Sequence, residues 1–218
     1  GERDNGAGTI SGHYFHQDLF VAREIFRRAP RRHIDVGSRL DGFVAHVASF
    51  RDVEVIDIRD LDPVHGISFL QADAMSLDMR QVGTTDSLSC LHALEHFGLG
   101  RYGDPICFDG WLVGLRTLVN LLEPDGILYL SVPTSAKQRV EFNAHRIFSL
   151  PFLHKVLGED FEVLQCSFVL DSGDFLPSVD LSTEEAQASF NCDYGLSIWV
   201  LQKKTREWMT GVPDYIAD

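Results

Sequence analysis

The apolar positions of this chain follow two different periods. Short, nearly continuous apolar runs favour buried strands, and runs whose bulky residues recur every three or four positions favour helices. The predicted strands cover residues 34–36, 53–58, 67–71, 86–91, 127–133, 161–169 and 196–201. The predicted helices cover residues 18–26, 43–50 and 108–122. Strands that alternate with helices in this way are typical of an α/β fold with a largely parallel sheet.

The last two predicted strands are joined differently from the others. Only an acidic loop, residues 171–194, separates them, so we expect them to pair in antiparallel fashion. We expect residues 13–204 to form one domain and residues 205–218 to form a C-terminal tail. Residues 1–12 are interpreted as a flexible lead-in or as residues foreign to the natural chain. His13, Tyr14 and His16 are interpreted as aromatic packing at the start of the first helix, in preference to a cover over a ligand.

A glycine turn after the first strand is the main candidate for ligand binding. Ile34 and Val36 flank Asp35, and Gly37 follows where the backbone must turn sharply. A strand, a turn and a helix N-terminus together present free N–H groups to a polar ligand. The dinucleotide fingerprint is absent, because Arg39 and Asp41 stand where further glycines are expected. An ordinary strand-to-helix turn would look similar, so both interpretations stay open.

Acidic residues end the next two strands. Asp57 lies about twenty residues beyond the turn, where a carboxylate can accept hydrogen bonds from ribose hydroxyls. Asp73 follows the third strand, and parallel strands bring their carboxyl ends to one edge of the sheet. We therefore expect Asp73 within reach of an adenine amino group. The alternative for Asp57 is a solvated carboxylate at a strand end.

Composition narrows the class of protein. A formal charge of −13 argues against a large nucleic-acid footprint, because most of the surface would repel a polyphosphate, and leaves room only for a local basic patch. The four cysteines form no Cys-x-x-Cys pair, so we interpret them as reduced thiols of a cytoplasmic protein. No apolar run is long enough for a membrane span, and no secretory signal is evident. The cysteines are Cys90, Cys107, Cys166 and Cys192.

The order of these signals resembles the class I S-adenosylmethionine-dependent methyltransferases. The resemblance rests on Asp35-Val36-Gly37, Asp57, Asp73-Ala74, the stretch 91–96 and the stretch 123–133 (EPDGILYLSVP), and it covers residues 34–201. Residues 35–43 (DVGSRLDGF), 91–105 (LHALEHFGLGRYGDP) and 139–146 (RVEFNAHR) are similar to a methyltransferase-like family of bacteria and nematodes. Some bacterial members of that family lie among polysaccharide-biosynthesis genes, which points weakly to a sugar substrate.

The resemblance implies a fold, a cofactor and a set of residues that bind it. The fold is a Rossmann-like, doubly wound, seven-stranded α/β sheet, mostly parallel with an antiparallel last strand. The cofactor is S-adenosylmethionine, with Gly37 against its methionine part, Asp57 on the ribose and Asp73 near the adenine. The implied cofactor-binding residues are Asp35, Gly37, Ser38, Arg39, Asp57, Ile58, Asp73, Ala74 and Leu91.

The same resemblance implies an acceptor pocket. The reaction is transfer of a methyl group to a small polar acceptor, such as a sugar or glycan hydroxyl. A hydroxyl keeps its proton at neutral pH, so a general base is needed, and histidine suits that task. The candidate bases are His92, His96 and His145. The candidate acceptor-binding residues are Glu95, Arg139, Glu141, Asn143 and Arg146, although a strand cap and a solvated loop would also account for these polar residues.

Three features of the sequence bear on other classes of function. His92-x-x-Glu95-His96 matches a zinc-peptidase pattern, but that chemistry needs one continuous helix, and Gly98 and Gly100 follow directly. We therefore expect no metal site. A dehydrogenase is disfavoured because the glycine fingerprint is missing. A methyltransferase-like domain that has lost catalysis and serves as a binding or scaffold module remains the second hypothesis, supported by the altered glycine turn.

Overall fold

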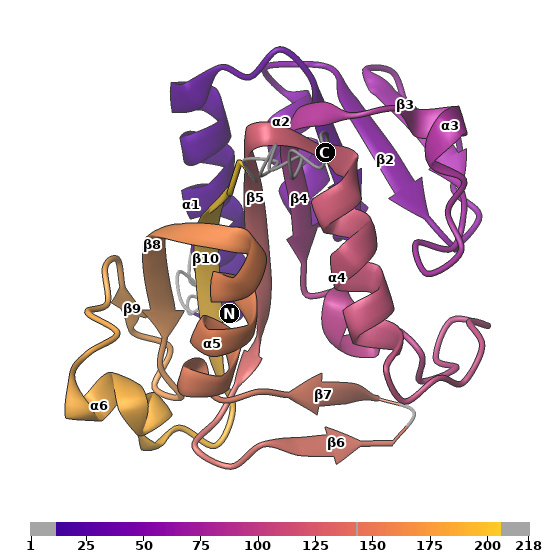
Figure 1. The fold of residues 1–218 in the computed structure, drawn as a ribbon. Coiled ribbons are helices and arrows are strands. Elements are labelled where there is room, and N and C mark those ends of the chain that lie inside the picture. Colours follow the sequence, from indigo (N-terminus) through magenta and orange to yellow (C-terminus); the bar gives the residue numbers. More distant parts are fainter. Residues whose placement is uncertain (1–11, 143, 206–218) are drawn as a thin grey trace, which may run out of the picture.

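The computed structural model contains one central eight-stranded sheet with helices on both faces (Figure 1). It describes residues 12–142 and 144–205, so most of the expected lead-in and tail, and Asn143, lie outside the described residues. The strands follow the order β3-β2-β1-β4-β5-β10-β8-β9 across the sheet. Their bounds are β1 His33–Val36, β2 Val53–Asp57, β3 Ile67–Gln71, β4 Thr85–Leu91, β5 Leu122–Thr134, β8 Phe161–Val169, β9 Phe175–Leu176 and β10 Gly195–Lys203.

The sheet is doubly wound and mostly parallel, as predicted. Strands β1 to β5 pair in parallel, and the chain reverses its winding direction between β1 and β4. Strand β10 pairs in antiparallel fashion with both β5 and β8, which confirms the expected antiparallel last strand. All seven predicted strands form. The eighth, β9, has two residues and extends the edge beside β8.

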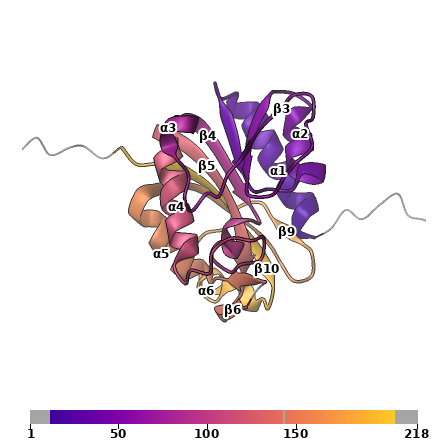
Figure 2. The same ribbon diagram turned by 90° about the vertical axis from the view of Figure 1, so that its right-hand side faces the viewer.

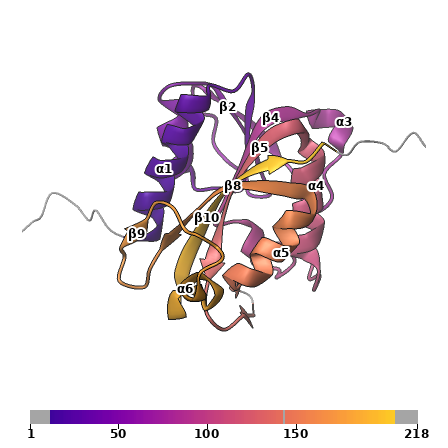
Figure 3. The ribbon, with the colours of Figure 1, turned by 60° about the vertical axis from the view of Figure 1, so that its left-hand side comes forward.

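Helices cover the two faces separately (Figures 2 and 3). Helices α1 (His13–Arg28) and α2 (Ala45–Ala48) lie on one face, where Val21 and Ile25 belong to the same apolar cluster as Ile198. The other face carries α3 (Met79–Val82), α4 (Gly110–Leu121) and α5 (Leu150–Asp160). The long helices α1, α4 and α5 each bury an apolar stripe against a nearly continuous apolar sheet, as expected for strands buried on both faces.

Several elements differ from the pattern-based prediction. Helix α1 begins five residues earlier than expected, and the helix after the glycine turn is replaced by a π-helical segment, Leu40–Val44, leading into α2. Helix α5 was not predicted. The acidic loop contains β9 and the short helix α6 (Glu184–Gln187). These are short or weakly periodic segments, in which tertiary packing outweighs local preference.

A hairpin replaces the polar loop predicted after β5. Strands β6 (Arg139–Glu141) and β7 (His145–Ile147) pair in antiparallel fashion, and Thr134 bridges to Phe148 at the hairpin's base. The hairpin lies beyond the carboxyl end of β5, at the lower edge of the sheet in Figure 1. It therefore brings His145 next to the residues that follow β4, with the His96 and His145 rings 6.1 Å apart.

The states of the cysteines and the lengths of the helices can be read directly from the structure. All four cysteines are free thiols, and burial raises the pKa of Cys90, Cys166 and Cys192. Within residues 12–142 and 144–205, none of the helices is long and apolar enough to cross a bilayer.

Candidate functional site

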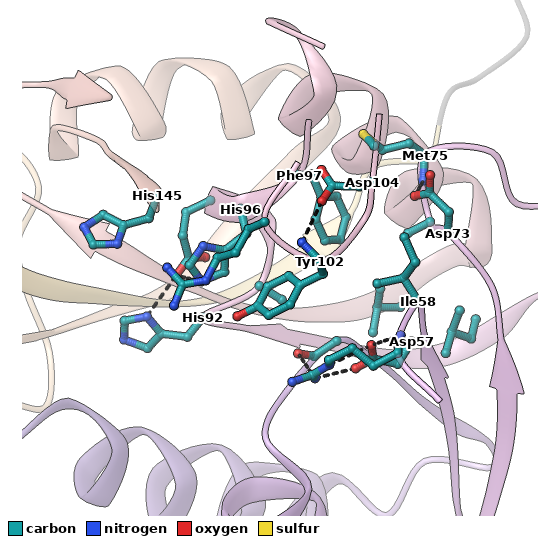
Figure 4. A pocket seen from close by; sticks show the side chains of 18 of the residues that line it. Asp57, Ile58, Asp73, Met75, His92, His96, Phe97, Tyr102, Asp104 and His145 are labelled. Atoms are coloured by element: carbon teal, nitrogen blue, oxygen red, sulfur yellow. Dashed lines mark hydrogen bonds and ion pairs between the residues drawn. The ribbon is translucent and has the colours of Figure 1, made fainter. Parts of the chain in front are cut away.

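A cavity of about 390 Å³ opens at the carboxyl ends of β1 to β4, beside the point where the winding reverses. Ligands of open α/β sheets bind in this position. Figure 4 shows Asp57, Ile58 and Asp73 on one side, the histidines on the other, and Tyr102 between them. We call the first side the β1–β3 wall (Gly37, Asp57, Ile58, Asp73, Ala74) and the second the histidine wall (His92, Glu95, His96, His145).

The glycine turn is shaped by a close approach of two loops. Gly37 has φ +75°, and a Cβ built on it would lie 3.0 Å from Cβ of Ala93. Beneath the turn, buried Asp35 accepts hydrogen bonds from the Ser38 backbone N–H at 3.0 Å and from the Ser38 and Ser89 hydroxyls at 2.6 and 2.5 Å. Burial raises the pKa of Asp35 to about 6. Asp35, Ser38 and Leu91 do not line the cavity; they support the turn from below.

Asp57 lines the cavity, but its carboxylate already has partners. It accepts from the Arg59 backbone N–H at 2.8 Å and from Arg59 Nε and Nη2 at 2.9 and 2.5 Å. Two of these bonds reach Oδ1 and one reaches Oδ2, which leaves about one of the four lone-pair sites, on Oδ2. The Arg59 guanidinium also lies 5.3 Å from the Tyr102 ring centre. Arg59, which was not among the predicted site residues, therefore links Asp57 to Tyr102 within the lining of the cavity.

The other part of the β1–β3 wall is the segment after β3, in which a backbone N–H binds Asp73. Oδ1 of Asp73 accepts from the Met75 backbone N–H at 2.8 Å. Ile58, Ala74 and Met75 add apolar surface to the same wall. Arg39 lines the cavity from the turn, pairs with Asp41 at 2.9 Å and lies over the Tyr14 ring at 4.9 Å.

Glu95 is the centre of the histidine wall. Its side chain is 0% exposed, and Oε1 accepts from His92 Nδ1 at 2.9 Å and lies 3.7 Å from His96 Nε2. Oε2 of Glu95 and Nε2 of His92 are buried without a hydrogen-bond partner. His92 has a left-handed φ of 50°, directly after β4. Buried polar atoms are nearly always paired, so these two atoms need an explanation.

His96 has a defined tautomer. Its Nδ1 donates to the Ala144 carbonyl oxygen, and a carbonyl can only accept, so the proton of the neutral ring lies on Nδ1. The lone pair is then on Nε2, the nitrogen nearer to Glu95. Burial lowers the pKa of His96, so its ring is neutral at neutral pH. A neutral imidazole with a free Nε2 is the state that a general base requires.

His145 reaches the same wall from the hairpin. Its Nε2 lies 3.2 Å from Glu141 Oε2 without the alignment of a hydrogen bond, and its ring is 5.4 Å from that of Tyr194. The three histidines that the sequence analysis selected therefore meet at one wall of one cavity.

Aromatic residues far apart in the sequence complete the cavity. Tyr14, Tyr102 and Tyr194 line it, and the sequence analysis selected none of them. The His13 ring stacks on His92 at 5.6 Å and on Tyr194 at 5.4 Å. Tyr14 therefore contributes to the cavity in addition to packing at the helix start, because α1 begins at the carboxyl edge of the sheet. In the sequence, the position of Tyr14 between His13 and His16 was the one sign that it could belong to a site.

Three predicted acceptor-binding residues lie outside the cavity. The Arg146 guanidinium, predicted to bind acceptor, donates to the backbone carbonyls of Glu95, Phe97, Cys107 and Phe108, and so holds the loop after β4 in place. Arg139 binds Glu141 at 3.0 Å and the Asp193 carbonyl at 3.2 Å, outside the cavity. Glu141 likewise does not line it. Asn143 lies outside the described residues.

The zinc-peptidase arrangement does not form. His92 precedes a single 3₁₀ turn, Leu94–His96, and its left-handed backbone prevents a continuous helix through the motif. Nδ1 of His92 points to Glu95 instead of to a position shared with His96. Two histidines on one helix face, which that chemistry needs, are therefore not present here.

The fold is that of known S-adenosylmethionine-dependent methyltransferases. N-methyltransferase NodS from Bradyrhizobium japonicum WM9, solved with S-adenosyl-L-homocysteine, matches with a TM-score of 0.56 and 12% identity, covering 87% of this chain and 86% of that chain. The 1,6-didemethyltoxoflavin-N1-methyltransferase from Burkholderia thailandensis gives 0.57 and 17%, covering 86% and 79%. A methyltransferase from Clostridium acetobutylicum ATCC 824 gives 0.57 and 10%, covering 89% and 93%. These likenesses confirm the predicted class I fold.

Sequence comparison gives the family. A search of curated proteins found no match. The model of a family described as "Caenorhabditis protein of unknown function, DUF268" matches residues 61–204, which is more than half of the chain. The match agrees with the expected link to nematode proteins and covers the strands β3 to β10 and the histidine wall. This chain belongs to that family. Its matched region, residues 61–204, is part of the class I methyltransferase fold described above.

Proposed function

We propose that this protein is an S-adenosylmethionine-dependent methyltransferase that acts on a small polar acceptor, such as a sugar or glycan hydroxyl. One observation carries the proposal: a single cavity brings the glycine turn and two strand-end acids opposite three histidines and a buried glutamate. The volume of about 390 Å³ is within the range of small-ligand sites. Solved proteins of this fold include a methyltransferase with bound S-adenosyl-L-homocysteine.

The β1–β3 wall fits the cofactor. Gly37 lines the cavity and carries no side chain, so a ligand can approach the backbone of the turn, while Ala93 closes the side where a Cβ would lie. We assign the methionine part to Gly37 and Arg39, the ribose to the remaining acceptor site of Asp57, and the adenine to Asp73, Ala74 and Ile58. Asp35, Ser38 and Leu91 support this wall. When bound, the cofactor supplies a sulfonium methyl group that a nucleophile can attack.

The histidine wall fits the acceptor. Positioning a nucleophile in line with the methyl group can supply much of the rate enhancement, and a base removes the acceptor proton. Among the three histidines, His96 has its tautomer set by Ala144 and a neutral ring, so we assign it as the base. His92 positions Glu95, and His145 forms the outer side of the wall. The polysaccharide link of the family resemblance supports a sugar as the acceptor.

Isothermal titration tests the proposal directly. We expect the purified chain to bind S-adenosylmethionine and S-adenosylhomocysteine and not NAD, which is the control for a dehydrogenase. Binding of the first two would justify a screen of nucleotide sugars and glycans as acceptors. If neither binds, the proposal fails.

Failure to bind would favour the second candidate, a methyltransferase-like binding or scaffold domain without catalysis. A specific observation supports that candidate: Arg59 already occupies most of the Asp57 carboxylate. The turn residues Arg39 and Asp41, which replace expected glycines, form an ion pair at the mouth of the same cavity.

A further inference from the structure

Glu95 differs from the other acids of the cavity in its partners. Asp57 pairs with the Arg59 guanidinium, and Asp104 accepts backbone N–H groups of Gly98 and Gly100 at 2.8 and 3.1 Å. Glu95 is fully buried, its Oε1 contacts the imidazoles of His92 and His96, and its Oε2 has no donor. A buried carboxylate that lacks a donor is costly, because burial removes the water that would solvate it. The cavity beside it is where such a donor can come from.

The groups around that position are hydrogen-bond acceptors. Nε2 of His96 carries a lone pair and lies 3.7 Å from Glu95 Oε1, and the carboxylate itself can only accept. A ligand group seated between Glu95 and His96 must therefore donate at least twice. A hydroxyl has one proton to donate, whereas an ammonium group has three. This arrangement selects a nitrogen donor.

Aromatic rings surround the same position. Tyr14 lies 5.0 Å from the His92 ring, Tyr194 lies 5.4 Å from His145, and Tyr102 lies 5.6 Å from His96. Two of these rings already hold cations, since Arg39 lies over Tyr14 and Arg59 over Tyr102. Burial, followed by the charge of Glu95, raises the pKa of Tyr194 to about 12, so its ring stays neutral. Ring faces stabilise a desolvated cation.

The cations of the chain near Glu95 have partners elsewhere. Arg39 pairs with Asp41 and Arg59 with Asp57, whereas Arg101 and Arg146 donate to backbone carbonyls, Arg146 to that of Glu95 itself. Among the residues that the structure describes, no lysine lines the cavity. None of these guanidinium groups donates to the Glu95 carboxylate, so a hydrogen-bond donor for Oε2 is left to a ligand in a cavity that three tyrosines line.

We propose that the acceptor presents a protonated primary amine, which binds between Glu95 and His96 within this aromatic ring. The inference rests on the proposed function and narrows its small polar acceptor: the methylated atom is an amine nitrogen in place of a hydroxyl oxygen, and a sugar acceptor is an amino sugar.

The chemistry balances with the residues present. Nε2 of His96 takes one proton from the ammonium group, which leaves a neutral amine with a lone pair. That lone pair forms the new N–C bond while the S–C bond of the sulfonium breaks and its electron pair stays on sulfur. The product is a methylated ammonium group, still paired with Glu95, and the proton on His96 passes to water when the product leaves.

Matched small probes test the inference without an identified acceptor. Protonated cyclohexylamine and cyclohexanol have the same ring and differ in the donor group, and both would be titrated into the ¹⁵N-labelled chain, with and without S-adenosylhomocysteine. We expect the amine to bind at least about tenfold more tightly than the alcohol, because it gains a charge-assisted bond to Glu95. Equal affinities, or no saturable shifts with the amine, would overturn the inference.

Three variants show which groups are responsible. Glu95→Gln keeps the shape of the side chain and should remove the preference for the amine. Tyr194→Leu should weaken amine binding about threefold, whereas Tyr194→Phe, which keeps the ring face, should bind as the wild type does. Tyr194 is 39% exposed, so both variants should fold. A preference that survives Glu95→Gln contradicts the inference.

The two proposals fail separately. If the wild-type chain does not bind S-adenosylhomocysteine, the proposed function is refuted, whatever the amine and alcohol probes show. Normal binding of S-adenosylhomocysteine, combined with equal affinities for amine and alcohol, would refute only the amine acceptor.

Discussion

The two walls of the cavity satisfy their polar groups in opposite ways. On the β1–β3 wall, Asp57 binds Arg59, Asp73 binds a backbone N–H, and Asp35 beneath them accepts three hydrogen bonds. On the histidine wall, Glu95 and His92 each keep a buried atom without a partner. On the first wall the chain itself provides most of the partners, although Oδ2 of Asp57 keeps about one acceptor site. On the second wall the chain leaves these atoms unpaired.

This difference follows from where the partners come from. The partners on the β1–β3 wall lie two or three residues away, or on the adjacent strand, so short turns provide them locally. The histidine wall combines the segment after β4, where Glu95 contacts His92 and His96, with His145 from the β6–β7 hairpin. A preorganised wall suits an invariant ligand, and an incomplete wall suits a group that changes during a reaction.

The largest expected effect is on catalysis at the histidine wall. Once an acceptor is found, His96→Gln should lower kcat about 10²- to 10⁴-fold, because the base is removed while the bond to Ala144 can be kept. His92→Gln should cost less, since His92 acts through Glu95. Steady-state kinetics would measure both. Equal losses in the two variants would contradict the assignment of His96 as the base.

The pH profile sharpens the same assignment. Burial lowers the pKa of His96, so its neutral form persists below the ordinary histidine range. We expect the acidic limb of kcat to lie below pH 6.5 in the wild-type enzyme. The residual activity of His96→Gln should lack that limb. An unchanged limb in the variant would assign it to another group.

On the β1–β3 wall, Asp57→Ala should weaken S-adenosylhomocysteine binding about 100-fold or more. The substitution removes the ribose acceptor and also leaves Arg59 without its carboxylate, and charge-assisted hydrogen bonds are among the strong ones. Isothermal titration measures the loss. Asp41→Ala is the matched control, because this exposed aspartate lies on the adjacent turn and does not line the cavity. Wild-type affinity in Asp57→Ala would refute the assigned pocket.

Beneath that wall, His33 should make stability depend on pH. It is buried between the hydroxyls of Ser87 and Ser89, and desolvation lowers its pKa to about 3. The unfolded state therefore takes up the proton first, and stability falls as the pH drops below 6.5, by about 2 kcal/mol at pH 5. Denaturant unfolding of His33→Gln should lack this part of the decline, with His154→Gln at an exposed position as control. Parallel curves for wild type and His33→Gln would contradict it.

The smallest effect is expected at the altered turn. Arg39 is half-exposed and pairs with Asp41, and exposed ion pairs contribute little. Arg39→Ala should therefore change S-adenosylhomocysteine affinity by only about threefold. A loss as large as that of Asp57→Ala would show that the replacement of glycine by arginine created an essential contact.

Patterns of short range gave the correct framework. The seven predicted strands and the carboxyl-edge positions of Asp57 and Asp73 follow from short apolar runs and from the rule that parallel strands end at one edge. The histidines were selected from the resemblance, and the structure places all three at the cavity. Whether they act in catalysis stays a proposal.

Side-chain partners could not be predicted in the same way. The sequence analysis treated Arg146 as an acceptor-binding residue, yet its guanidinium binds carbonyls of a loop some forty to fifty residues earlier in the chain. Arg59 lies two residues from Asp57 and was overlooked, although its proximity was visible. The sequence shows the type of a charged residue near a site, but its hydrogen-bond partners are known only once the fold is known.

The sequence alone therefore determined the α/β class, the placing of Asp57 and Asp73 at one edge of the sheet, and the negative net charge of the chain. These properties depend on local apolar patterns and on composition. Only the tertiary structure decided which polar atoms are already paired. That depends on contacts between distant segments: α1 brings Tyr14, the hairpin brings His145, and the loop before β10 brings Tyr194 to a glutamate buried without a full set of partners.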